Sequence, residues 1–409
     1  MATAVLLGTL DTKGREYAFV RDELTSRGIE VVVVDIGVLG EPSFAPDVTS
    51  ADVAEAAGSS LGALRFAREG SDTRAVALEA MQDGAVRVIA DLRVAGRCDG
   101  VLGLGGSGGT ALISAVMRTL PLGVPKLVVS TMASGDVGAY VGSSDLCIMH
   151  SVTDIAGLNR ISRPILRNAA GALAGMITTA PTAETDRPAV GLTMLGVTTP
   201  GALRIAQRLE DMGFDPIVFH AVGSGGRALG ELVDQGILVG VVDFTVKEIT
   251  DELFGGVFDA GPRRLVAAGE AALPQVVIPG AIEVLNFGAV DTVPVTFRDG
   301  IRPLVRHNAQ VTAVRLTAAE SVAAARVMAD RLNRSVGPLH VLIPTEGFDS
   351  YDQAGGPFWD PAADAAVVDE LERRLRPDIR VTTIAAHIND RVFADAVADA
   401  FLELVPLAL

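Results

Sequence analysis

Residues 100–113 read GVLGLGGSGGTALI, and this stretch sets the pattern for the whole chain. An apolar run ends in a glycine-rich loop, after which Leu112, Val116 and Leu120 recur every four residues, as on one face of a helix. The order strand, glycine loop, helix is typical of a phosphate site. Glycines let the backbone approach an oxyanion closely, and the first amides of the helix point at it. The stretch therefore predicts a phosphate-bearing ligand.

The loop departs from two well-known glycine fingerprints. Gly103, Gly105 and Gly108 match G-x-G-x-x-G, but a dinucleotide fingerprint follows the first strand of its domain, and this loop does not. A P-loop would have lysine directly before Thr110, at the position that Gly109 occupies in this chain. The alternative is a tight turn that only lets the helix pack on its strand. The candidate ligand-binding residues of the loop are Gly105, Gly106, Ser107, Gly108, Gly109 and Thr110.

Two further loops in this half carry hydroxyl and charged side chains after expected strands. The first, residues 8–14, could hold a phosphate through Lys13 and a hydrated Mg²⁺ through Asp11, or its side chains could simply cap the next helix. The second, residues 130–136, ends in Asp136, a second candidate ligand for Mg²⁺. The candidate binding residues in these two loops are Thr9, Asp11, Thr12, Lys13, Thr131, Ser134 and Gly135.

Short runs of Val, Ile and Leu alternate with longer amphipathic stretches along the chain, which predicts an α/β fold with parallel sheets. Strands are expected near residues 3–8, 30–36, 99–104, 125–131, 145–149, 189–196, 215–220, 237–243, 275–279, 339–344 and 379–385. Asp35, at the end of the second strand, is either a ribose ligand or a solvated loop residue. The polar segment 179–188 separates two Rossmann-like domains, 1–182 and 183–409, which we expect to face a common cleft.

The composition excludes several classes of partner. With 34 Lys and Arg against 50 Asp and Glu, the net charge of −16 disfavours DNA and anionic membrane surfaces. No apolar run is long enough to span a bilayer, and the N-terminal apolar stretch is too short for a signal peptide. Only two cysteines are present, Cys98 and Cys147, so we expect no disulfide framework and a cytoplasmic location.

Histidines and carboxylates gather in the second half of the chain, where several follow expected strands. The candidate catalytic residues are His220, Glu283, His307, Glu346 and His387. We expect them to converge on one pocket with the Gly/Pro-rich loop 355–361 at its mouth, where a metal-assisted or acid–base hydrolase or lyase could act on a small polar substrate. The alternative is that each histidine caps a structural element and each carboxylate is solvated.

The chain resembles the Tm-1-like ATP-binding proteins, a family of uncharacterised bacterial proteins related to the N-terminal region of the tomato mosaic virus resistance protein. The matching stretches are Gly8–Gly14, Gly103–Thr110, His220–Arg227, Phe254–Phe258, Ala260–Pro262, Pro279–Ala281, Asn286–Gly288, His307–Asn308, Gly356–Phe358, Asp360–Pro361 and His387–Asp390. The chain departs from the family pattern at Val246–Lys247 and at Glu346–Phe348.

The resemblance implies two Rossmann-like domains, ATP and Mg²⁺ bound by the first of them, and a homodimer. In the plant protein the implied partner is a viral replication protein, a role that belongs to one branch of the family. A third possibility beside an ATP-binding protein and an enzyme is an interaction protein whose nucleotide only stabilises the dimer.

Overall fold

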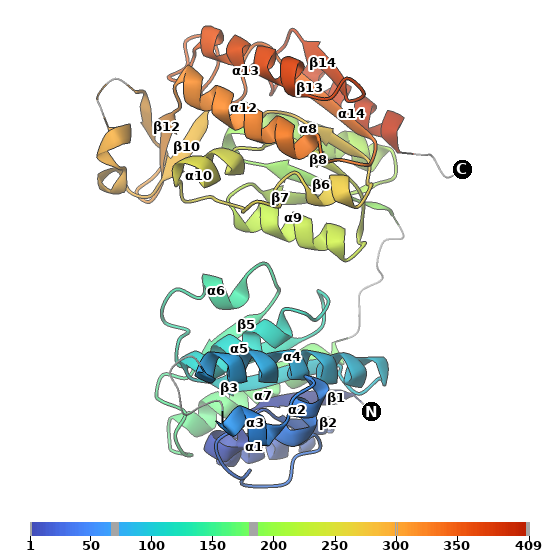
Figure 1. The fold of residues 1–409 in the computed structure, drawn as a ribbon, viewed down its shortest axis with the longest axis vertical. Coiled ribbons are helices and arrows are strands. Elements are labelled where there is room, and N and C mark those ends of the chain that lie inside the picture. Colours follow the sequence, from blue (N-terminus) through green and yellow to red (C-terminus); the bar gives the residue numbers. More distant parts are fainter. Residues whose placement is uncertain (1, 67–72, 180–186, 299, 301, 406–409) are drawn as a thin grey trace. The chain divides into compact units, whose positions relative to one another are not determined.

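The computed structural model describes residues 2–66, 73–179, 187–298, 300 and 302–405, and the chain divides into two compact units, Met1–Ala183 and Glu184–Leu409. The boundary expected at residues 179–188 falls mainly on residues 180–186, which lie outside the described residues. Each unit is an α/β domain built on a parallel sheet with helices on both faces, so the predicted fold class is confirmed (Figure 1).

The first unit contains a five-stranded parallel sheet in the order β2-β1-β3-β4-β5. Its strands are β1 (Thr3–Gly8), β2 (Glu30–Asp35), β3 (Gly100–Gly105), β4 (Lys126–Ser130) and β5 (Cys147–His150). In this doubly wound order the direction of winding reverses between β1 and β3. The helices that follow these two strands therefore pack on opposite faces of the sheet, and a crevice opens between them.

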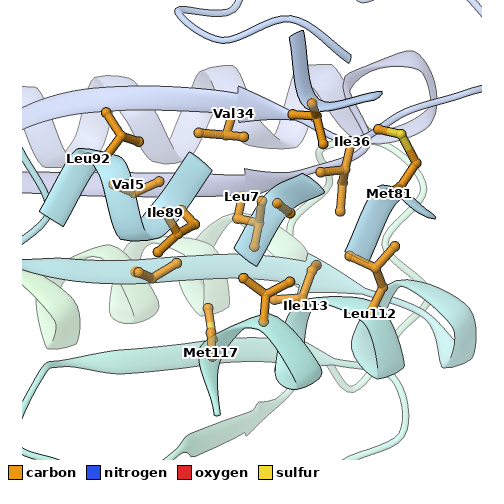
Figure 2. Close-up of a cluster of buried hydrophobic side chains, with 14 of the residues drawn as sticks. Val5, Leu7, Val34, Ile36, Met81, Ile89, Leu92, Leu112, Ile113 and Met117 are labelled. Carbon is orange, nitrogen blue, oxygen red and sulfur yellow. The ribbon is translucent and has the colours of Figure 1, made fainter. Parts of the chain in front are cut away.

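Alternate strand residues of this sheet feed two apolar cores, one on each face. One helical layer consists of α2 (Ser50–Ala56), α3 (Leu61–Phe66), α4 (Thr73–Val94) and α5 (Ser107–Met117), and the other of α1 (Leu10–Thr25) and α7 (Ser162–Thr178). Figure 2 shows Val5 and Leu7 of β1 in the first core, together with Ile89 of α4 and Ile113 of α5. A short helix, α6 (Gly138–Val141), lies in the connection from β4 to β5.

The second unit repeats this topology and adds a strand. Its six parallel strands are ordered β14-β13-β9-β8-β6-β7, which places the first strand of the unit between the second and third, as in the first unit. The strands are β6 (Ala189–Met194), β7 (Asp215–His220), β8 (Leu238–Asp243), β9 (Gln275–Val277), β13 (Leu339–Pro344) and β14 (Arg380–Ile384). The repeat in the sequence thus corresponds to a repeat of strand order.

Helices cover both faces of this second sheet. One face packs against α8 (Thr199–Asp211) and α14 (Arg391–Leu404) through a core that includes Phe393 and Phe401. The other face packs against α9 (Ser224–Asp234), α10 (Glu248–Phe254), α11 (Ala267–Glu270), α12 (Ala318–Leu332) and α13 (Pro361–Arg374). The described residues of this unit also form short 3-10 turns at η2 (Gly196–Thr198), η3 (Val290–Thr292) and η4 (Val295–Phe297).

All eleven strands expected from the sequence are present within a few residues of their predicted positions, but a second, smaller sheet was not predicted. It is antiparallel, in the order β10-β12-β11, and consists of β10 (Val284–Phe287), β11 (Leu304–Arg306) and β12 (Thr312–Arg315). This sheet forms one wall of the cavity described below. Among the described residues, no helix has the length and apolar character needed to cross a membrane.

Candidate functional site

A cavity of about 360 Å³ opens at the carboxyl ends of β1, β2 and β3 in the first unit. Its lining comes from the turns after β1, β2 and β3 and from α4 and α5, and consists of Thr9, Asp11, Thr12, Lys13, Ile36, Val38, Leu39, Ala77, Leu78, Met81, Gly106, Ser107, Gly108, Gly109 and Leu112. The position is the reversal point of the strand order, where open parallel sheets bind their ligands, and the volume lies within the roughly 300–1,000 Å³ of small-molecule sites. The glycine loop and the first βα turn therefore share one cavity.

The glycine loop begins α5 without a side-chain cap. Gly106 is the N-cap residue, in extended conformation, and no side chain accepts a hydrogen bond from the first turn of the helix there. A Cβ atom added to Gly108 would meet no atom within 4 Å, and one added to Gly106 or Gly109 would come no closer than 3.9 Å and 3.8 Å to its nearest neighbour. Packing of the protein itself therefore does not require glycine at these three positions, and the alternative of a mere packing turn fits them poorly.

Gly105 differs from its neighbours in the loop. A Cβ atom there would lie 2.4 Å from the Thr110 amide nitrogen, so this glycine is needed for the turn from β3 into α5. Thr110 is fully buried and its hydroxyl pairs with that of Ser130 at 2.7 Å. Gly105 and Thr110 do not line the cavity, and these contacts give both a structural role beneath the loop.

The turn after β1 supplies the polar side chains of the cavity. Asp11 accepts hydrogen bonds at Oδ2 from the amides of Leu39 (2.8 Å) and Gly40 (3.2 Å). Its Oδ1 is buried and has no hydrogen-bond partner among the described residues. Thr9 and Thr12 pair through their hydroxyls at 2.8 Å, and Lys13 donates from Nζ to the Ile155 carbonyl at 2.8 Å. The cavity thus offers an ammonium, two hydroxyls and a free carboxylate oxygen.

Apolar side chains form the opposite wall of this cavity. Ile36, Met81 and Leu112 belong both to the core on this face of the sheet and to the cavity lining, and Figure 2 shows them at one end of that core. Leu39 and Leu78 extend the wall. Leu39 is 52% exposed and Leu78 is 38% exposed. A flat apolar group could pack on this wall while a charged group lies at the glycine loop.

The second candidate loop, 130–136, is not part of this lining. Thr131 lies at its edge, since its hydroxyl would be 3.9 Å from a Cβ atom on Gly106. Ser134 and Gly135 are exposed, and Asp136 is exposed and accepts a hydrogen bond from the Gly138 amide at 2.9 Å. Among the described residues, no group of three or more His, Cys, Asp or Glu side chains is arranged to hold a metal ion.

Asp35 is neither a ribose ligand nor a solvated residue. It is buried beneath the first βα turn, where its Oδ1 accepts hydrogen bonds from the amides of Leu10 (3.0 Å) and Gly37 (2.9 Å). Burial raises the pKa of this carboxyl. Asp35 therefore fixes the turns after β1 and β2 that carry the cavity residues.

A second cavity, of about 240 Å³, lies at the carboxyl ends of β6, β7 and β13 in the second unit, against the small antiparallel sheet. Its lining is mostly apolar and includes Val197, Val222, Phe258, Val284 and Val311. The polar residues that line it are His220, Asn286, His307, Asn308, Asp349 and Tyr351.

The structure brings together only part of the predicted catalytic set. His220 and His307 line this cavity, and His307 Nδ1 lies 3.1 Å from the Tyr351 hydroxyl. His387 pairs through Nε2 with the Asp349 carbonyl at 2.8 Å, behind the lining. Glu346 is exposed and does not line the cavity. The prediction that these residues catalyse a reaction stays a prediction.

Glu283 belongs to a buried acidic cluster beside the cavity. It is fully buried, and neither oxygen of its carboxyl group has a hydrogen-bond partner among the described residues. Burial and the nearby carboxylates of Asp349 and Asp352 raise its pKa well above the usual range. A protonated Glu283 explains how this side chain is tolerated in the core, because burial favours the neutral form.

The loop 355–361 does not cover the mouth of the cavity, since none of its residues lines the cavity. Phe358 is instead buried, with its ring centre 5.3 Å from that of Tyr351, and belongs to the same apolar cluster as Val197 and Val284. The loop therefore supports the cavity wall from behind.

The predicted catalytic set did not include Asn286, Asp349 or Tyr351, which line the cavity. Asp349 lies between Glu346 and Asp352 in the sequence, and such a spacing of carboxylates is also typical of a solvated loop. Asn286 lies on β10, which the apolar run around it concealed. The signal that could have identified Asp349 is its position five residues after the buried strand β13, in a sheet whose other strands are also followed by polar residues.

The glycines at the start of α9 contrast with those of α5. A Cβ atom on Gly225 would lie 2.0 Å from the His220 carbonyl oxygen, so packing requires this glycine. The carboxylate of Glu248 accepts from the amides of Gly223 (2.7 Å) and Gly226 (3.1 Å), and Arg264 neutralises it with a 2.6 Å hydrogen bond. This helix terminus already holds an anion of the protein itself.

Comparisons with known proteins cover both units. The sequence model described as the N-terminal domain of the uncharacterised protein family UPF0261 matches residues 2–182, and the model of the C-terminal domain matches residues 187–405. UPF0261 proteins of Rhizobium meliloti and Clostridium tetani are 43% and 40% identical, over 99% and 98% of both chains. The ToMV resistance protein Tm-1 of Solanum lycopersicum is 40% identical over 75% of this chain and 42% of its own length.

Proposed function

Since the chain belongs to the uncharacterised protein family UPF0261, which includes relatives of the tomato Tm-1 proteins, we propose that its first unit binds ATP together with Mg²⁺. The observation that carries the proposal is the group of three glycines at the uncapped start of α5, which face a cavity and which packing does not require. ATP itself comes from the resemblance to the Tm-1-like ATP-binding proteins.

The phosphates would lie at the start of α5. An anion there meets the free amides and the positive end of the helix dipole, and the absence of a Cβ atom at Gly106, Gly108 and Gly109 lets it approach the backbone. Lys13 lines the same cavity and would add a positive charge after exchanging its contact with the Ile155 carbonyl. The hydroxyls of Thr9 and Thr12 would donate to remaining phosphate oxygens.

Asp11 is the protein group that suits the Mg²⁺ ion. Its Oδ2 is fixed by two backbone amides, so the buried Oδ1 without a partner is held in one place. Mg²⁺ usually takes one or two carboxylates together with water and phosphate oxygens, so a full set of protein ligands is not needed. Asp136 caps a turn and is not part of the cavity lining, so we do not propose it as a ligand.

The adenine ring would pack on the apolar wall of the cavity. Ile36, Met81 and Leu112 provide a fixed floor, because they are part of the core, and Leu39 and Leu78 are free to close over the ring. Stacking on aliphatic side chains favours a flat heterocycle but does not distinguish adenine from other bases.

Isothermal titration calorimetry on the full chain tests the proposal. ATP with Mg²⁺ should bind, ATP with EDTA should bind more weakly, and NAD⁺ and a UDP-sugar should bind weakly or not at all. Tight binding of NAD⁺ without binding of ATP would overturn the proposal. The variant Asp11→Asn should reduce the difference between the titrations with Mg²⁺ and with EDTA, because it removes the charge that holds the ion.

We extend the proposal to a homodimer in the cytoplasm. The family resemblance implies the dimer, and the two free cysteines, Cys98 and Cys147, suit a reducing compartment. Sedimentation equilibrium with and without ATP and Mg²⁺ checks the oligomeric state, and a mass of one chain under both conditions would exclude the dimer.

A further inference from the structure

The cavity of the second unit contains two buried hydrogen-bond acceptors that the protein leaves unused. Asp349 is fully buried, and its Oδ1 accepts from the amides of Tyr351 (2.7 Å) and Asp352 (3.0 Å), while its Oδ2 has no partner among the described residues. Asn286 is 5% exposed, and its Oδ1 also has none. Buried polar atoms without a partner cost free energy, so two of them lining one cavity point to a ligand that donates hydrogen bonds.

The charge around Asp349 favours a cationic donor. Four buried carboxyl groups interact with one another here, and the guanidinium of Arg315 lies among them and pairs with Asp364 at 2.8 Å. The carboxyl groups are those of Glu283, Asp349, Asp352 and Asp364. Burial raises the pKa of several of these groups, so they ionise more readily when a positive charge is brought in from outside to replace the stabilising water that burial has removed.

The rest of the lining limits the body of the ligand. Val197, Val222, Phe258 and Val284 form an apolar surface around the acceptors, and the volume of about 240 Å³ suits a small molecule. The exposed side chains of His220 and His307 lie at the solvent side, where they can contact polar groups of the ligand. The cavity therefore has an acidic, buried end and apolar walls along the rest of its length.

We propose that this cavity binds a small primary amine, whose ammonium group donates a hydrogen bond to Asp349 Oδ2 and whose carbon chain packs on the apolar wall. Asn286 Oδ1 accepts a further hydrogen bond from the ligand. The site lies wholly in the second unit and does not depend on the proposed ATP site in the first.

Binding of the amine is coupled to protonation of Asp349. Burial is the main cause that raises the pKa of Asp349, to about 7, and the charge of Asp352 acts in the same direction. The other groups that face Asp349 are the carboxyl group of Glu283, the guanidinium of Arg315 and the Tyr351 hydroxyl. The His387 ring contacts the backbone carbonyl of Asp349. An ammonium ion needs the ionised carboxylate, so below pH 7 the amine must first displace a proton.

The test uses n-butylammonium as the probe on the full chain, with 1-butanol and butyrate as controls of similar shape but different charge. Calorimetry should show binding of n-butylammonium at least about tenfold tighter than of either control, since a hydrogen bond to a charged group is worth more than a neutral one. Affinity should fall about tenfold per pH unit below the Asp349 pKa of about 7 and level off above it. Equal binding of 1-butanol, or no binding of the amine at pH 8, overturns the proposal.

Three variants separate the site from a general attraction of cations to an acidic protein. Asp349→Asn keeps an oxygen for the amides of Tyr351 and Asp352 but should lose amine binding and its pH dependence. Val222→Phe keeps the carboxylate but should narrow the cavity and weaken binding. Glu372→Gln removes the same charge from the exposed surface of α13 and should leave binding unchanged. Unaltered binding by a folded Asp349→Asn variant contradicts the assignment.

Discussion

Replacement of Gly108 by alanine should strengthen the fold and weaken ATP binding at the same time. Gly108 is the second residue of α5, and a Cβ atom there would meet no atom within 4 Å. Glycine in a helix costs about 0.5–1 kcal/mol relative to alanine, mainly through the entropy of the unfolded chain. In the ligand-free protein the first unit should therefore be more stable by about that amount. For a domain of this size the melting temperature should rise by about 1–4 °C.

The effect on binding should have the opposite sign. The new methyl group would occupy the space through which a phosphate approaches the first amides of α5. Loss of one hydrogen bond to a charged group costs about 1.5–3 kcal/mol, which corresponds to about a 10- to 150-fold weaker affinity for ATP. Thermal unfolding of the ligand-free protein and calorimetric titration with ATP and Mg²⁺ measure the two effects separately.

Two control variants make the result specific. Gly175 lies exposed in α7, and a Cβ atom there would also meet nothing within 4 Å, so Gly175→Ala should raise stability equally and leave ATP binding unchanged. Gly105→Ala should lower stability, because its Cβ atom would lie 2.4 Å from the Thr110 nitrogen. A Gly108→Ala protein with full ATP affinity would refute the reasoning and leave the loop as a packing turn.

Three further predictions concern charged groups. Lys13→Met should weaken ATP binding by about tenfold or more and reduce its dependence on salt, measured by titration at two ionic strengths, and an unchanged affinity would remove Lys13 from the site. Burial raises the pKa of Asp349 to about 7 and of Asp364 to about 8, so from about pH 4 to pH 8 the folded protein holds protons that the unfolded chain has released. Calorimetric unfolding should thus show that the second unit is most stable at the acidic end of the range pH 5–8 and becomes less stable as the pH rises through 7–8. The Asp364→Asn variant should show a flatter dependence of stability on pH. A stability that increases with pH over this range would contradict the assignment. Lys247→Met should cost about 3–5 kcal/mol in urea unfolding, because it leaves the fully buried Asp251 carboxylate without its partner, and Lys247→Met with Asp251→Leu should recover much of that loss.

The pair formed by Lys247 and Asp251 lies within the core of the second unit. Both side chains are fully buried, and the Lys247 ammonium lies 4.5 Å from the centre of the Phe258 ring. Desolvation lowers the pKa of Lys247, while the charge of Asp251 acts against this effect. The lysine is thus a structural element behind Phe258, which lines the cavity of the second unit.

The sequence by itself determined the α/β class, the positions of the eleven parallel strands and the glycine loop at 103–110. Each of these follows from a local pattern: β-branched runs of four to six residues, helical spacing of apolar residues, and glycines between them. It also placed Thr9, Asp11, Thr12 and Lys13 after a strand, and the structure has them in one cavity with the glycine loop. Parallel strands end at one edge of a sheet, so residues after different strands meet there.

Only the tertiary structure decided which of these side chains are free for a ligand. Asp11 and Asp35 look alike in the sequence, because each is an acid near the end of a strand. In the structure Asp35 Oδ1 accepts hydrogen bonds from two backbone amides, whereas Asp11 Oδ1 has no partner among the described residues. In the second unit Asp349 became part of a cavity only because the small antiparallel sheet, from residues 284 to 315, packs over the ends of the parallel strands. Burial and hydrogen-bond partners depend on residues far apart in the chain, whereas the patterns that predict strands and helices depend on neighbours within a few positions.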